Sequence, residues 1–114
     1  MDARVRGWSL LKVEAIELLD DDWPGWVRVR LVDAADVSWT FEGKVPIFFA
    51  GDAPTRATSL PVAAHIRCHV LRTDRGADGR EVSVVSTAMD GVETEDGLDE
   101  FRVFSDQIEQ PAME

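Results

Sequence analysis

The strongest alternation of apolar and polar positions in the chain begins directly after Pro24-Gly25. Every second residue over 26–33 is apolar, which indicates a half-buried strand. One face carries Val27, Val29 and Leu31, and the other carries Trp26, Arg28 and Arg30. Pro presets φ at the second position of a type II turn, and Gly accepts a positive φ at the third. The pattern therefore predicts a type II turn that leads into a strand.

Residues 8–19 carry two periodicities at once. A helical face would gather Trp8, Leu11, Ala15, Leu18 and Leu19. Strand alternation fits equally well if its phase changes near Ala15, as a β-bulge would allow. We favour the strand, because a hairpin is the shortest connection between this segment and the strand that follows the turn.

The rest of the chain reads as short β-rich runs separated by turns. Strands are predicted at 37–41, 62–72, 81–88 and 101–104, and a further strand at 45–49 that lies at an edge or starts after Pro46, because Pro46 cannot donate to a ladder. Turns or loops are predicted at 33–36, 50–59 and 74–80. Residues 1–7 read as a polar arm, and residues 105–114 as a fraying tail with one helical turn at 105–110.

Six or seven short strands with turns every 8–12 residues predict an all-β fold. The length of 114 residues fits one domain over 1–114. The expected architecture is a small antiparallel barrel or a barrel-like sandwich, and the sequence leaves these two open.

Composition points to a soluble chain in a reducing compartment. No run approaches the roughly 18 apolar residues of a membrane span. The first residues lack the apolar core of a secretory signal. Cys68 is the single cysteine, so no internal disulfide is possible. We therefore expect a cytoplasmic protein without a membrane partner.

The net charge of −10 is unevenly distributed. Residues 1–89 have a net charge of −2, whereas residues 90–114 carry nine acidic side chains and only Arg102. A chain without a basic footprint is not expected to bind nucleic acid through its phosphates. Acidity of this kind favours solubility or encounter with a basic partner.

The densest acidic stretch is the candidate partner-binding site. Its members are Asp90, Glu93, Glu95, Asp96, Asp99 and Glu100. These side chains could form an acidic face that occupies a basic groove of a partner. The alternative is a solvated surface that serves solubility alone, which is how most charge runs behave.

Two tryptophans flank the predicted turn and join the candidate binding residues. Trp23 and Trp26 could cap one end of a barrel, which is the role we favour, or stand exposed as a contact hot spot. Trp39 alternates with polar residues and is expected in the core.

The motif formed by His65, Cys68 and His69 is the strongest candidate for a chemical site, because these residue types bind zinc. On a strand, however, the two histidines lie roughly 13 Å apart. That separation is too long for one ion, and Cys68 points to the opposite face. The expected arrangement is a buried cysteine with two solvent-facing histidines beside Arg67.

Two acidic stretches also resemble cation sites at first sight. In the segment that starts at Asp74, the third and twelfth positions of a calcium loop, which require ligand side chains, are occupied by Gly76 and Val85. A turn therefore explains this segment better. Asp20, Asp21 and Asp22 are adjacent, and on extended chain their carboxylates are expected to point in different directions. No metal and no cofactor is predicted.

Catalysis has little support, and the chain is interpreted as a non-enzyme. It has no Gly-x-Ser-x-Gly elbow, no glycine-rich phosphate loop and no Tyr. In composition and size, though not in any motif, such a small acidic β domain is similar to some bacterial immunity and inhibitor proteins. This resemblance implies a protein-binding module that presents an acidic segment to a basic partner.

Two alternatives remain. One is a small-ligand-binding barrel or minor enzyme with a pocket under the 50–59 loop, lined by Phe48, Phe49 and Trp39. The other is a structural subunit that associates with its own kind or another chain, through an edge at Pro46 or the face of Arg28 and Arg30.

Overall fold

The computed structural model describes residues 7–51 and 53–110 and shows a nearly all-β molecule. Its strands are β1 (Ser9–Asp20), β2 (Trp26–Val32), β3 (Ser38–Lys44), β4 (Val62–Arg75), β5 (Glu81–Ser86), β6 (Glu100–Phe104) and β7 (Ile108–Glu109). Most of the predicted polar arm and the last four residues of the tail lie outside the described residues.

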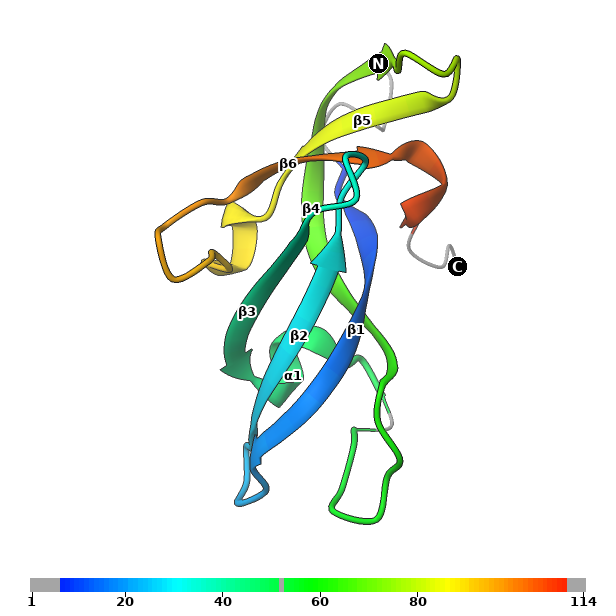
Figure 1. The fold of residues 1–114 in the computed structure, drawn as a ribbon. Coiled ribbons are helices and arrows are strands. Elements are labelled where there is room, and N and C mark those ends of the chain that lie inside the picture. Colours follow the sequence, from blue (N-terminus) through cyan, green and yellow to red (C-terminus); the bar gives the residue numbers. More distant parts are fainter. Residues whose placement is uncertain (1–6, 52, 111–114) are drawn as a thin grey trace.

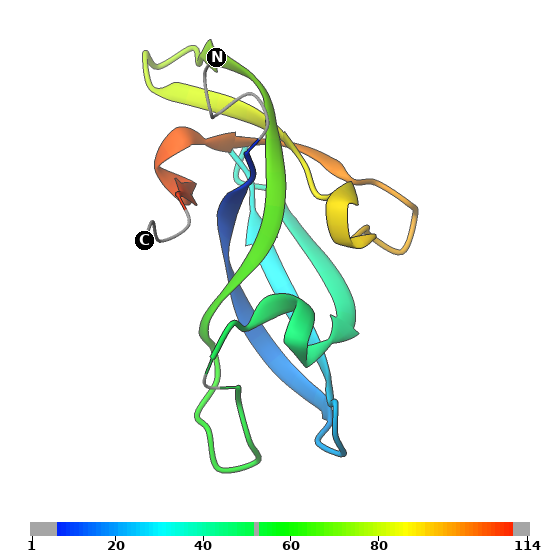
Figure 2. The ribbon, with the colours of Figure 1, turned by 180° about the vertical axis from the view of Figure 1, so that it is seen from behind.

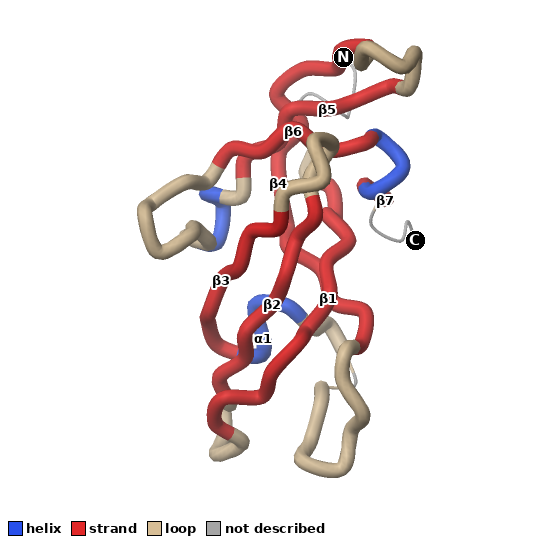
Figure 3. Tube along the Cα trace, in the orientation of Figure 1, coloured by secondary structure: helices blue, strands red, loops and turns tan. Residues whose placement is uncertain are grey.

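The strands form one antiparallel sheet in the order β3-β2-β1-β4-β5-β6, with β7 paired to β1. Figure 1 shows this sheet curling around itself, and Figure 3 shows how little of the molecule is helical. The all-β prediction is confirmed. Of the two architectures left open, the molecule adopts the barrel type, as a curled half-barrel rather than two stacked sheets.

The ambiguous segment before the turn is a strand, as predicted. β1 pairs with β2, and the register shifts between Ala15 and Glu17 and again between Leu18 and Asp20. The first shift is the expected change of phase near Ala15. It lets Leu11, Val13 and Ala15 face the core while the strand bends onward toward the turn.

The turn itself differs from the predicted type II geometry. The Gly25 N–H donates to the Asp22 carbonyl at 2.6 Å, which places Pro24 third in the turn rather than second. The Trp23–Pro24 peptide bond is cis, as in type VI turns. Gly25 has φ of +85°, and a Cβ there would lie 2.9 Å from Val45 Cγ2. Glycine is needed because this turn touches the segment after β3.

The segment after β3 also differs from its predicted structure. Residues 45–49 were expected to form a strand, but Val45–Phe48 is a single helical turn, α1. Pro46 is compatible with the first turn of a helix, where its missing N–H costs no hydrogen bond. Val45 and Phe48 are three residues apart, so one helical face buries both in the core. The proposed pairing edge at Pro46 therefore does not exist as a strand.

The core lies inside the curl of the sheet. It is built from alternate residues of β1, β2 and β4 together with side chains of α1, β3, β5 and β6. Phe101 on β6 contacts Phe41 edge-on, with ring centroids 5.4 Å apart, and Trp39 at 5.7 Å. The Ala34 N–H also donates to the Arg102 carbonyl at 2.9 Å. The two ends of the sheet thus meet across the core without pairing as strands.

Within the predicted tail, residues 105–109 form regular structure rather than fraying. Ser105–Gln107 forms a 3₁₀ turn, η3, and β7 then pairs with Leu10 and Leu11 of β1. The Gln107 side chain accepts from the Phe104 N–H at 2.9 Å and donates to the Val32 carbonyl at 2.8 Å. Over 7–51 and 53–110, no helix has the length and apolar character needed to cross a membrane.

Candidate functional site

Residues 91–99, here called the acidic loop, join η2 (Ala88–Asp90) to β6. In Figure 1 the loop projects sideways from the sheet, in orange. Of the predicted binding residues, Glu93, Glu95, Asp96 and Asp99 lie in this loop, and Glu100 begins β6. The loop is therefore the structural unit that carries most of the predicted acidic site.

Buried Thr87 holds both ends of the acidic loop. Its hydroxyl donates to the Val92 carbonyl at 2.7 Å, and its N–H donates to the Asp99 carbonyl at 2.8 Å. The Val92 N–H returns a bond to the Thr87 carbonyl at 3.3 Å. Val92 itself is buried against the core. The loop thus leaves and rejoins the sheet at a fixed, water-shielded base.

The outer part of the loop is a tight turn. The Gly97 N–H donates to the Thr94 carbonyl at 2.9 Å, and Gly97 has φ of +85°. The Leu98 N–H donates to Thr94 Oγ1 at 3.0 Å, while the Thr94 N–H donates to the Leu98 carbonyl at 2.9 Å. Glu95 and Asp96 consequently stand at the tip.

The five carboxylates of this region have no cationic partner among the residues that the structure describes. Glu93, Glu95, Asp96 and Glu100 are exposed, and Asp99 is half-exposed. Within the part of the chain that the structure describes, none of the five forms an ion pair or a side-chain hydrogen bond, although nine ion pairs form elsewhere. Leu98, 38 % exposed, adds an apolar side chain next to them.

Asp90 does not belong with the other predicted acidic residues. Arg67 on β4 donates to it twice, from Nε to Oδ2 at 2.9 Å and from Nη2 to Oδ1 at 2.5 Å. These hydrogen bonds lower the pKa of Asp90 below its ordinary value. Its charge is therefore neutralised on the protein. The sequence could not show this, because 23 residues separate the two side chains.

The two candidate tryptophans lie at the β1–β2 turn, which Figure 1 shows at the lower end of the molecule, far from the acidic loop. Trp23 is 91 % exposed and caps nothing, so the favoured capping interpretation is wrong for this residue. Trp26 is 40 % exposed. The structure therefore does not unite the tryptophans and the acidic residues in one surface.

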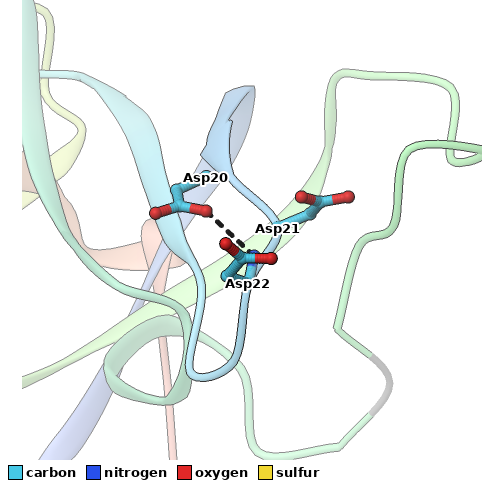
Figure 4. A group of neighbouring side chains, drawn as sticks. All are labelled: Asp20, Asp21 and Asp22. Atoms are coloured by element: carbon cyan, nitrogen blue, oxygen red, sulfur yellow. Dashed lines mark hydrogen bonds between the residues drawn. The ribbon is translucent and has the colours of Figure 1, made fainter.

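The three aspartates before Trp23 come together instead of diverging. The Asp22 N–H donates to Asp20 Oδ1 at 2.9 Å, and this local turn brings one oxygen of each carboxylate within 4.8 Å of the others (Figure 4). The expectation of divergent side chains is thus wrong. Arg56, from the loop between α1 and β4, bonds Asp21, with Nε and Oδ2 2.5 Å apart.

The strand prediction at the His-Cys-His motif is confirmed. Cys68 is fully buried, and burial raises the pKa of its thiol to about 11. His65 and His69 lie on the other face of β4. His65 Nε2 lies 2.6 Å from Glu109 Oε1 on β7.

The face of Arg28 and Arg30, one of the predicted association surfaces, forms cross-strand ion pairs within the chain. Arg28 bonds Glu17 and Glu42 on the two neighbouring strands, and Arg30 bonds Glu14 at 2.8 Å. These bonds follow the register of β2 with β1 and β3. Both arginines of this face therefore have carboxylate partners within their own sheet.

A cleft of about 690 Å³ lies beside α1, and among the described residues of the 50–59 loop only Ala50 lines it. Its lining includes Phe48 and Phe49, as expected, but also residues that sequence reasoning left out: Trp8, Leu10, Lys44, Pro46, Ile47, Ala50, His65, Arg67 and Asp90. Trp39 points elsewhere, and its Nε1 donates to Asp33 Oδ2 at 2.8 Å. The outward alternation of His65 and Arg67 was visible in the sequence, but their position near α1 was not.

Comparison with known proteins returned no match. No protein-family model matched the chain, and searches of curated proteins and of solved structures found none either. Function is therefore argued from the acidic loop and the cleft.

Proposed function

We propose that this protein is a non-catalytic binding module that presents its acidic loop to a basic surface of a partner protein. The observation that best supports this proposal is that the backbone of the acidic loop is hydrogen-bonded while its carboxylates lack ion pairs among the described residues. Thr87 and Thr94 hold the loop in one conformation, while the carboxylates of Glu93, Glu95 and Asp96 have no intramolecular cation among the described residues.

Preorganisation of this kind favours binding. A loop that is already ordered loses little conformational entropy when a partner docks. Clustered like charges also steer a basic partner and raise the association rate at low salt. The exposed Leu98 supplies an apolar contact beside the charges. An inhibitor-type or immunity-type role, in which the loop occupies a basic groove, fits these properties.

Several acidic residues elsewhere in the molecule form ion pairs, which sets them apart from the carboxylates of the acidic loop. Arg28 and Arg30 form ion pairs with Glu14, Glu17 and Glu42 on the sheet, whereas residues 91–100 contain five acidic and no basic side chains. Among the described residues the acidic loop is therefore a cluster of unpaired negative charge, and the Asp20–Asp22 group, where Arg56 bonds Asp21, is a smaller one.

The test is partner capture followed by binding kinetics. The immobilised protein is exposed to extract from its source cells at low ionic strength and at about 1 M salt, where the Debye length is about 3 Å. A protein retained only at low salt is purified and its association rate is measured. We expect Glu95→Lys with Asp96→Lys to slow association by about tenfold or more.

The matched control is Asp22→Lys with Glu81→Lys, which makes the same change in net charge at exposed positions away from the loop. Association of the control should change by less than about twofold, the range expected of distant charges screened by salt. Equal slowing of both variants, or no salt-sensitive partner, contradicts the proposal. If the captured protein is a second copy of this chain, the module acts as a subunit of its own oligomer, and a solution mass measurement shows it.

A further inference from the structure

The cleft beside α1 arises from a gap in the sheet. Residues 62–68 of β4 pair with β1 along one edge, but pairing with β5 begins only at His69. No strand of the described chain covers the other edge of that stretch. α1 and η2 flank it instead, and Figure 2 shows α1 lying beside the lower half of β4.

The walls of this cleft are mainly apolar. Trp8 directly precedes β1 and Leu10 lies near its start, while Pro46, Ile47 and Phe49 come from α1 and the residue after it. Ile47 and Phe49 pack partly against the core, so this wall is anchored. The volume of about 690 Å³ falls within the range of about 300–1,000 Å³ typical of small-molecule sites.

Some of the basic side chains in the cleft face an acidic partner, and one does not within the described residues. Asp90 neutralises Arg67, whose guanidinium also lies 5.3 Å from the centre of the Trp8 ring. His65 faces Glu109. Lys44 forms no ion pair with any described residue. Lys44 is therefore a cation of this mainly apolar cleft that has no acidic partner within 7–51 and 53–110, in a protein whose net charge is −10.

We propose that this cleft binds a small, mostly apolar molecule that carries one carboxylate. The Lys44 ammonium receives the carboxylate, and the apolar body lies between Trp8 and the side chains of Ile47 and Phe49. A single free cation selects a monoanion, because a second carboxylate would be desolvated without a partner. The acidic loop takes no part in this site, so the proposal stands independently of the proposed protein partner.

The test uses three probes of one shape: naphthalene carboxylate, naphthalene carboxamide and naphthylmethylammonium. Each is titrated into the whole protein and followed by NMR at the Trp8 indole N–H and the Phe49 amide. We expect the carboxylate to bind about tenfold more tightly than the amide, as one charge-assisted contact provides, and the cation most weakly.

Variants separate the charge contribution from the apolar one. Lys44→Gln should remove the preference for the carboxylate over the amide, whereas Trp8→Ala should weaken both probes and keep the preference. Lys12→Gln is the matched control, because Lys12 is exposed and pairs with His65 across β1 and β4 but does not line the cleft. The control should retain the preference within about twofold, as expected outside the contact.

The proposal is supported if the preference exists and disappears in Lys44→Gln alone. It is overturned if no probe shifts the Trp8 and Phe49 signals, if all three probes bind equally, or if Lys12→Gln loses the preference as Lys44→Gln does. Unchanged amide spectra away from the cleft show that each variant is folded, which the exposure of both lysines leads us to expect.

Discussion

The base of the acidic loop is held by two backbone hydrogen bonds of Thr87 and by the hydroxyl group of its side chain. Thr87→Val keeps the shape of the buried side chain but removes the bond to the Val92 carbonyl, which measures 2.7 Å. Leaving a buried carbonyl without a donor costs about 1–3 kcal/mol. At about 4 °C per kcal/mol for a domain of this size, the melting temperature should fall by about 4–12 °C. The loop should loosen as well, because the lost hydroxyl bonds the Val92 carbonyl and also lies 3.3 Å from the Asp99 carbonyl, although the backbone bonds of Thr87 remain.

The assay combines thermal unfolding, followed by circular dichroism, with amide hydrogen exchange at Thr94 and Leu98. Both amides should exchange faster in Thr87→Val, since their mutual hydrogen bonds depend on the fixed base. Thr40→Val, at an exposed position of β3, makes the same chemical change and should stay within about 0.5 kcal/mol of the parent protein. If Thr87→Val melts as Thr40→Val does and its loop amides remain protected, the loop is not held in the way described.

Three further predictions follow from local geometry. Gly25→Ala should lower the free energy of unfolding by about 2–4 kcal/mol in urea titration, because φ is +85° and the new Cβ would meet Val45; an unchanged midpoint would disprove the close approach. The Arg67 hydrogen bonds lower the pKa of Asp90, so its stabilising contribution is present above the unfolded pKa of about 3.9 and is lost as pH falls. Asp90→Asn should therefore be less stable than the parent at neutral pH and lose less stability on acidification, and parallel pH profiles would argue against the ion pair. Cys68, fully buried and with its pKa raised to about 11, should react with iodoacetamide at about pH 8 only after unfolding in urea, as mass spectrometry can show; rapid labelling of the folded protein would contradict its burial.

The two proposed sites carry opposite charges in different parts of the half-barrel: the acidic loop presents carboxylates, and the cleft presents the ammonium group of Lys44. Both depend on how the chain distributes its ion pairs. Arg67 pairs with Asp90 and is thereby neutralised, so it bonds neither the acidic loop nor a ligand of the cleft, and Lys44 is left as a cation without an acidic partner among the described residues. Substituting Arg67 would disturb both regions, which is why the tests use Lys44 and the loop tip instead.

Local patterns determined most of the strands. Residues 26–32 alternate because one face of β2 packs on the core and the other meets solvent, and this period of two is written in the sequence. The bulge near Ala15 could be anticipated for the same reason, since the apolar positions change phase there. The acidic loop was also visible, as a glycine-punctuated run of like charges.

Short segments with several allowed conformations were decided by tertiary contacts. Val45–Phe49 is an apolar run that suits either a strand or a helical turn, and the helical turn forms because it buries Val45 and Phe48 together. The turn at Pro24 and Gly25 adopts its geometry where Gly25 touches Val45. Neither contact has a signature in the local sequence.

What the sequence alone determined is therefore the fold class, most of the strands and the excess of negative charge near the C-terminal end. Only the tertiary structure decided which charges remain free. The pairing of β4 with β1, and the gap that β5 leaves beside it, bring Arg67 to Asp90 and set the cleft against α1. The physical reason is that ion pairs and clefts depend on distances between residues far apart in the chain, whereas periodicity reports only which face of an element is buried.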